Sequence, residues 1–110
     1  MTTLIKYRGK VVAVAGATRF HLAPSVEVLV RRDPLRAIVA LMCVFAERVQ
    51  AGELPGLYSD QRAELYARSA LIGDDEFTRA TGEGLEDDEL AERFNVPPEQ
   101  IDAKRRDLHA

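Results

Sequence analysis

The sequence is poor in the side chains from which metal and disulfide sites are built. It has one cysteine, Cys43, and two histidines, His21 and His109, which lie far apart in the chain. A zinc site needs three or four converging ligands and a disulfide needs two cysteines, so neither is expected within this chain. The single thiol favours a reducing compartment. We therefore expect a cytoplasmic protein without a metal or other cofactor.

Long apolar stretches are also missing. The uncharged run 37–46 is far shorter than the roughly 20 residues that span a bilayer. The first residues are charged and strand-like, unlike a signal peptide, and no membrane partner is expected. The net charge of -3 does not favour nucleic acid. Charge is unevenly spread, however. Residues 1–32 contain six Lys/Arg and one acid, whereas residues 33–110 contain nine Lys/Arg and seventeen acids. The two parts either attract each other or present differently charged faces, and we favour solvated faces without a partner.

The chain is organised around residues 33–52, which predict one long buried helix. Asp33 can cap its start, Pro34 fits the first helical position, and Gly52 offers a stop. Neither histidine nor any charged residue occurs between residues 37 and 46, so apolar side chains cover almost every face, as in a core helix. The apolar positions that recur at helical spacing are Ile38, Leu41, Met42, Phe45 and Val49.

Short apolar alternations precede this helix and predict three to four strands, at residues 4–7, 10–15, 19–22 and 26–30. The connections are too short for crossovers, so the strands should be antiparallel. We therefore expect an α+β fold in which a small sheet packs on the buried helix.

The second half of the chain predicts helices. Ser59 can cap an amphipathic helix whose inward stripe is Ala63, Tyr66, Ala67, Ala70 and Leu71. Shorter helices should follow. The expected single domain of residues 1–110 comprises strands (1–32), a core helix (33–52), a second helix (59–73) and a helical C-terminal part (74–110).

Asp60 and Glu64 form a possible acid pair on the second helix. Their i, i+4 spacing places them on one face, where like-charge repulsion could raise one carboxyl pKa. Together with His21 they would be the groups of an unrecognised enzyme. We favour the simpler interpretation, in which both carboxylates are solvated, because no partner group is identifiable.

The pattern of segment 89–101 is typical of a helix-turn-helix, with a helix, a tight turn and a second helix. Three basic residues follow the segment: Lys104, Arg105 and Arg106. This motif supports an alternative function as a small DNA-associated regulator. However, the helix that would enter the groove begins with Pro98 and Glu99 in acidic surroundings. DNA recognition usually requires a basic surround, so a packing pair of helices is favoured.

Residues 60–72 resemble the second helix of the ImmA/IrrE-type metallopeptidases. That helix has an acid, an Ala three residues later, an aromatic-Ala pair and a Leu-rich exit, as do Asp60, Ala63, Tyr66-Ala67 and Leu71 here. Residues 88–96, followed by Ile101 and Leu108, are similar to the family's closing pattern. Residues 26–33 are similar to the edge strand before its active helix. The resemblance implies a zincin-like minimal domain.

The resemblance fails where the family has its catalytic His-Glu-x-x-His motif. The matching residues are 41–45, so that Leu41 and Phe45 occupy the histidine positions and Met42 the glutamate position. Only Asp60 remains, at the position of the third ligand. Leu and Phe cannot ligate zinc, and Met cannot accept a proton as the Glu would. Leu41 and Phe45 should instead point toward the second helix near Asp60.

The resemblance therefore implies a pseudoenzyme, with no catalytic residue and no metal. Its expected function is that of a non-catalytic, regulatory protein-binding module. The family is associated with phages and mobile elements, where active members act on a repressor. A repressor-type or host protein is thus the implied partner, and nucleic acid is the less favoured one.

Overall fold

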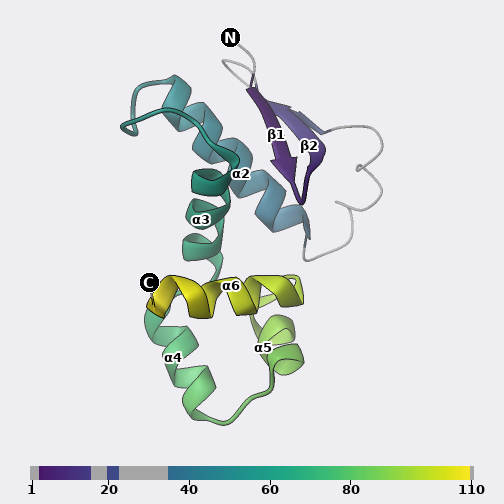
Figure 1. Cartoon of the computed structure of the whole chain (residues 1–110), viewed down its shortest axis with the longest axis vertical. Helices are drawn as coiled ribbons and strands as arrows, with labels where there is room; N and C mark the ends of the chain where they lie inside the picture. The colour runs from purple at the N-terminus through teal and green to yellow at the C-terminus, as the bar shows by residue number, and fades with distance from the viewer. Residues whose placement is uncertain (1–2, 16–19, 23–34, 110) are drawn as a thin grey trace.

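The computed structural model describes residues 3–15, 20–22 and 35–109, and its fold is mostly helical α+β (Figure 1). Within these ranges an antiparallel hairpin with a short third strand is followed by five helices. The expected α+β class is confirmed. The predicted fourth strand at 26–30 and the predicted cap at Asp33 and Pro34 lie outside the described residues.

The hairpin consists of β1 (Thr3–Tyr7) and β2 (Lys10–Ala15), and β3 (Phe20–Leu22) pairs with β2, so the sheet order is β1-β2-β3. Arg8 and Gly9 connect β1 to β2 with φ angles of 56° and 78°. Two positive φ angles give a two-residue turn whose twist matches that of the strands. Along β1, Ile5 and Tyr7 are buried between exposed residues, as the sequence alternation predicts.

Helix α2 (Leu35–Gln50) and helix α3 (Asp60–Leu71) pack together and against the hairpin. Beyond the end of α2, Gly52 has a φ of 77°, consistent with its predicted role as a stop. The predicted cap of α3 is confirmed, because the Ser59 hydroxyl accepts a hydrogen bond from the Arg62 N–H at 3.1 Å. The fully buried apolar residues of this first core include Ile5, Ala13, Ile38, Val39, Met42, Cys43, Ala46, Ala63 and Ala67.

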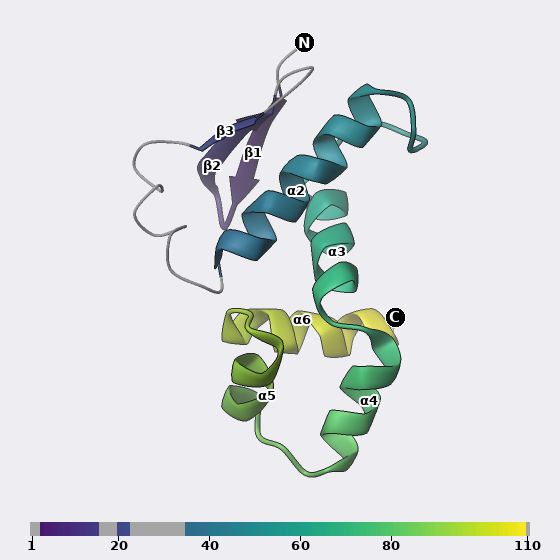
Figure 2. The ribbon, with the colours of Figure 1, turned by 180° about the vertical axis from the view of Figure 1, so that it is seen from behind.

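Three further helices, α4 (Asp74–Gly82), α5 (Asp87–Phe94) and α6 (Pro98–His109), enclose a second core. Figure 2 shows α3 leading from α2 to this group, with α6 crossing the end of α3. Leu71 at the end of α3 packs against both cores. The second core is formed by Ile72, Phe77, Ala80, Leu90, Ala91, Val96 and Ile101.

Two details of the expected helices were wrong. Ala70 is exposed, although the stripe on α3 placed it inward. Helix α4 continues through Gly82, although the run Thr81-Gly82-Glu83-Gly84 in the sequence predicts a flexible break. None of the described helices is long and apolar enough to cross a bilayer.

Candidate functional site: the two sides of helix α3

The three helix residues that the resemblance assigns to a metal site, Leu41, Met42 and Phe45, pack in the first core. Met42 is fully buried, Phe45 is 4% exposed and Leu41 is partly buried against the same core. The Phe45 ring centroid lies 5.3 Å from that of Tyr66 on α3 and 6.0 Å from that of Tyr58. On this side α3 therefore meets α2 through apolar and aromatic contacts.

Arg62 joins the same aromatic group. Its guanidinium lies 5.1 Å from the centre of the Phe45 ring. It also donates hydrogen bonds to the main-chain oxygens of Leu57 at 2.6 Å and Pro55 at 2.8 Å. These contacts fasten the loop between α2 and α3 over Phe45, at the start of α3.

Asp60, which the resemblance assigns to the position of the third ligand, accepts two hydrogen bonds. One carboxylate oxygen accepts from the Lys6 N–H at 3.0 Å and from the Tyr58 hydroxyl at 2.8 Å. Burial, together with the hydrogen bond to Asp60, raises the pKa of Tyr58, so this hydroxyl stays a donor at neutral pH. Asp60 thus links the start of α3 to β1.

The structure directs Asp60 and Glu64 to different partners. Glu64 accepts from Arg68 at 3.1 Å and from the Gln100 amide at 3.3 Å, away from the contacts of Asp60. The side chain of His21 lies outside the described atoms, and His109 is exposed at the end of α6. Within the described residues, no group of three or more His, Cys, Asp or Glu is placed to hold a metal ion.

Cys43 is fully buried on α2. Burial, with a smaller contribution from Glu47, raises the pKa of its thiol to about 12. Because the thiolate is the reactive form, Cys43 is a poor nucleophile at neutral pH.

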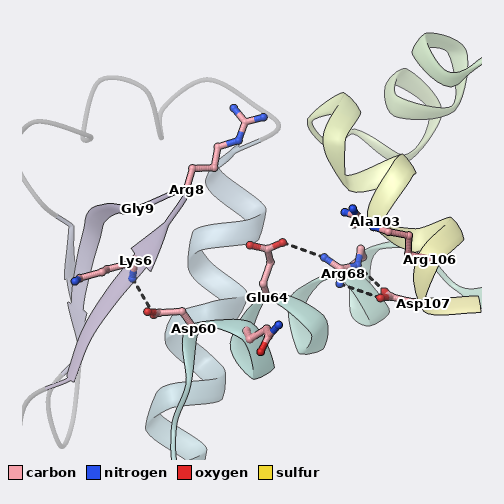
Figure 3. A pocket seen from close by; sticks show the side chains of 10 residues that line it. Lys6, Arg8, Gly9, Asp60, Glu64, Arg68, Ala103, Arg106 and Asp107 are labelled. Atoms are coloured by element: carbon pink, nitrogen blue, oxygen red, sulfur yellow. Dashed lines mark hydrogen bonds and ion pairs between the residues drawn. The ribbon is translucent and has the colours of Figure 1, made fainter. Parts of the chain in front are cut away.

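A neighbouring face of α3 borders an open cleft of about 600 Å³ (Figure 3). Its walls are the hairpin end of β1, helix α3 and helix α6. Charged residues of both signs line it: Lys6, Arg8, Asp60, Glu64, Arg68, Arg106 and Asp107. The cleft is therefore polar, in contrast to the closed aromatic contact around Phe45.

Arg68 anchors the floor of this cleft. Its side chain is 8% exposed and donates two hydrogen bonds to Asp107, at 2.6 and 3.1 Å. It also donates to Glu64 at 3.1 Å and to the Gln100 side-chain oxygen at 2.9 Å. Burial alone lowers the pKa of Arg68, but Asp107 and Glu64 outweigh that effect, and the pKa lies above its ordinary value. This network ties α3 to α6.

The network continues to the hairpin through Tyr7. Its hydroxyl donates to Glu99 at 3.0 Å and accepts from Gln100 at 2.9 Å, while Arg8 forms an ion pair with Glu99 at 2.8 Å. Burial is the main cause that raises the pKa of Tyr7 to about 12, Glu99 adds to it, and Gln100 opposes it. The hairpin tip is thereby connected to α6 by polar contacts.

Sequence reasoning missed this network as a site. The i, i+4 spacing of Glu64 and Arg68 was a visible signal for one of its ion pairs. Gln100 and Asp107 are 32 and 39 residues from Arg68 in the chain, and no local pattern relates them to it.

The three basic residues of the helix-turn-helix alternative do not share one exposed surface. Lys104 is 2% exposed and is paired with Asp74. Arg105 is paired with Asp87, and its guanidinium lies 6.0 Å from the centre of the Phe77 ring. Arg106 borders the cleft (Figure 3). Of the three residues, only Arg106 therefore forms no ion pair among the described residues.

No protein-family model, curated protein or solved structure matches the chain. The resemblance to the ImmA/IrrE-type metallopeptidases thus rests on the residues that carry it.

Proposed function

We propose that this protein is a non-catalytic protein-binding module, a pseudo-peptidase with the fold of the ImmA/IrrE-type metallopeptidases. The observation that supports this proposal most is the aromatic contact of Phe45, buried against Tyr66 and Tyr58. A histidine ligand would stand in its place if the site were catalytic. The partner would be a repressor-type or host protein, held without being cleaved.

Energetics favour the packed form of such a site. Burying a Met or Phe side chain contributes about 1.5–3 kcal/mol, whereas an unpaired polar group in the same place would cost free energy. The hydrogen bonds of Asp60 to Lys6 and Tyr58 also give that carboxylate a structural use without a metal. The residues thus form a stable core while the outer surfaces of the domain stay available to a partner.

The decisive experiment restores the lost motif. In the triple variant L41H/M42E/F45H, two histidines should join Asp60 in binding one zinc ion, with the new glutamate beside it. We expect the variant to be less stable than wild type without metal and to gain thermal stability when zinc is added. Wild-type protein should show no zinc-dependent change in melting temperature.

The double variant L41H/M42E, which lacks one histidine, is the matched control and should respond weakly. A folded triple variant without any zinc-linked stabilisation would contradict the assignment of these positions. Stoichiometric zinc in purified wild-type protein, or hydrolysis of a peptide by it, would contradict the pseudo-peptidase itself. If neither result is found, co-purification with the tagged protein from the native host would identify the partner.

The alternative, a DNA-associated regulator, depends mainly on Arg106, because Lys104 and Arg105 are engaged in ion pairs. A DNA-binding titration at several salt concentrations tests it. Phosphate contacts weaken steeply as salt rises, so the absence of salt-sensitive binding at micromolar protein would remove this alternative.

A further inference from the structure

The outer edge of β1 offers main-chain groups to a partner. The sheet order places β1 at an edge, and within the described residues no strand pairs with that side. The Lys6 N–H points outward, to the Asp60 carboxylate at 3.0 Å. Main-chain direction alternates along a strand, so the N–H and C=O of Leu4 face the same edge. An edge with such groups is a template for an added strand.

The side chains along this edge indicate what such a strand would carry. Leu4 is 56% exposed, and Lys6 and Arg8 are also exposed, whereas Ile5 and Tyr7 point into the core. An added strand would place its outward side chains opposite Leu4, Lys6 and the hairpin tip. Opposite charges stabilise such cross-strand pairs, which favours acidic residues in the partner.

The cleft gives this strand room and adds Arg106 to Lys6, whereas Arg8 at the same opening is already paired with Glu99. It borders β1 at Lys6 and Arg8, and Figure 3 shows the Arg106 side chain on the α6 wall of the same opening. Its carboxylates already accept hydrogen bonds: Asp60 from Lys6 and Tyr58, and Glu64 from Arg68 and Gln100. They are therefore less available to a ligand than Arg106, for which no ion pair occurs among the described residues.

We propose that the outer edge of β1 binds an extended acidic segment of a partner protein, which takes the Lys6 N–H over from Asp60. This inference rests on the proposed protein-binding function and names its surface and partner chemistry. A second copy of the chain is disfavoured in the register that pairs Lys6 with Lys6, because that register brings two like charges together.

The probe is a short capped peptide in which Glu and Thr alternate, titrated into the isotopically labelled full chain. We expect saturable shifts of the Leu4 and Lys6 amide signals. A peptide with Lys in place of Glu should bind at least about fivefold more weakly. In a third peptide, alternate amides of the Glu-Thr sequence are N-methylated, which removes the N–H donors along one edge. This peptide should lose binding when that edge faces β1. Equal binding of all three peptides, or the absence of shifts at Leu4 and Lys6, would overturn the proposal.

Two variants separate docking from folding. Lys6→Glu should reverse the preference, so that the Lys-Thr peptide binds better than the Glu-Thr peptide. Arg79→Glu on α4 makes the same change in net charge far from the cleft and should leave the preference as in wild type. A reversal by Arg79→Glu as well would attribute binding to net charge and overturn the proposal.

Asp60→Ala tests the exchange at the Lys6 N–H. This variant should be less stable than wild type, yet bind the Glu-Thr peptide more tightly, because the competing carboxylate is gone. A purely structural Asp60 would make binding weaker or leave it unchanged, and that result would overturn the exchange.

Mass spectrometry of the peptide after the titration distinguishes the two proposals. Cleaved peptide with shifts at Leu4 and Lys6 would refute the non-catalytic function and retain the docking edge. Intact peptide without these shifts would refute the docking edge alone.

Discussion

The two sides of helix α3 meet their neighbours by opposite means. Toward α2, Ala63 and Ala67 are fully buried, and Tyr66 packs on Phe45. Toward β1 and α6, Glu64 and Arg68 enter a network of directed hydrogen bonds beside an open cleft. The apolar side depends on burial, which has no direction, whereas the polar side requires each donor to meet a particular acceptor.

This difference bears on function. On the closed side, the resemblance assigns Leu41, Met42 and Phe45 to a metal site. These apolar side chains pack in the first core. The open side has charged groups and the outer edge of β1, with which none of the described strands pairs. The following perturbations test how separate the two sides are, beginning with the largest expected effect.

Removing the Phe45 ring should break the apolar side. Phe45→Ala deletes a buried aromatic side chain and its contacts with two tyrosines, so unfolding free energy should fall by about 3–5 kcal/mol. Denaturant unfolding measures the change. Leu65→Ala, on the solvent-exposed part of α3, should change stability by less than about 0.5 kcal/mol. Similar losses for both variants would show that the packing around Phe45 is not special.

Removing Arg68 should break the polar side. Arg68→Ala leaves Asp107 and Glu64 without their cation, and we expect a loss of about 2–3 kcal/mol, below the full value for deeply buried pairs because both carboxylates are partly exposed. Amide hydrogen exchange should quicken in α6 more than in α2. Arg106→Ala, a matched arginine deletion on α6, should stay near wild type. An equal increase in the amide exchange rate throughout the chain would contradict a local role for the network.

The Tyr7 hydroxyl should contribute a smaller and pH-dependent part of the free energy of unfolding. Tyr7→Phe should cost about 1 kcal/mol at neutral pH through its lost hydrogen bonds. The folded-state pKa of Tyr7 is raised from 10.0 to about 12. The folded state therefore retains the proton longer, and its contribution, complete below pH 10, is lost as the pH rises through 12. The stability difference between wild type and Tyr7→Phe should shrink over that interval, and a constant difference would exclude the linkage.

The mildest test probes Cys43 without changing the sequence. Since burial raises its thiol pKa to about 12, iodoacetamide should not label the native protein at pH 8. Labelling should follow unfolding in denaturant, and mass spectrometry measures it. Rapid labelling of the native protein would show that the apolar side of α3 opens readily.

Much of the fold could be predicted from local patterns. The apolar stretch of α2, the Ser59 cap and the alternation along β1 each depend on neighbouring residues, which the sequence displays directly. Ala70 shows the limit of such patterns, because the stripe marks which residues lie on one helix face but not how far a neighbour covers that face. On α3, neighbouring elements cover Ala67 and part of Leu71 but leave Ala70 exposed.

The candidate site depended on residues far apart in sequence. Asp60 appeared as the last acid of a lost metal site, but its actual partners include the N–H of Lys6, 54 residues away. Lys104 belonged to the basic residues of the DNA-binding alternative and is instead buried and paired with Asp74. The charge of a side chain is visible in the sequence, whereas its partner is decided by how the helices are placed.

By itself, the sequence determined that the middle of α2 is apolar, as in a core helix, and contains neither histidine nor carboxylate, because side-chain chemistry at each position is intrinsic. Only the tertiary structure decided that Asp60 holds the edge of β1 and that Arg68 joins α3 to α6. Hydrogen bonds act over about 3 Å and in defined directions, so they exist only once the chain has brought their two ends together.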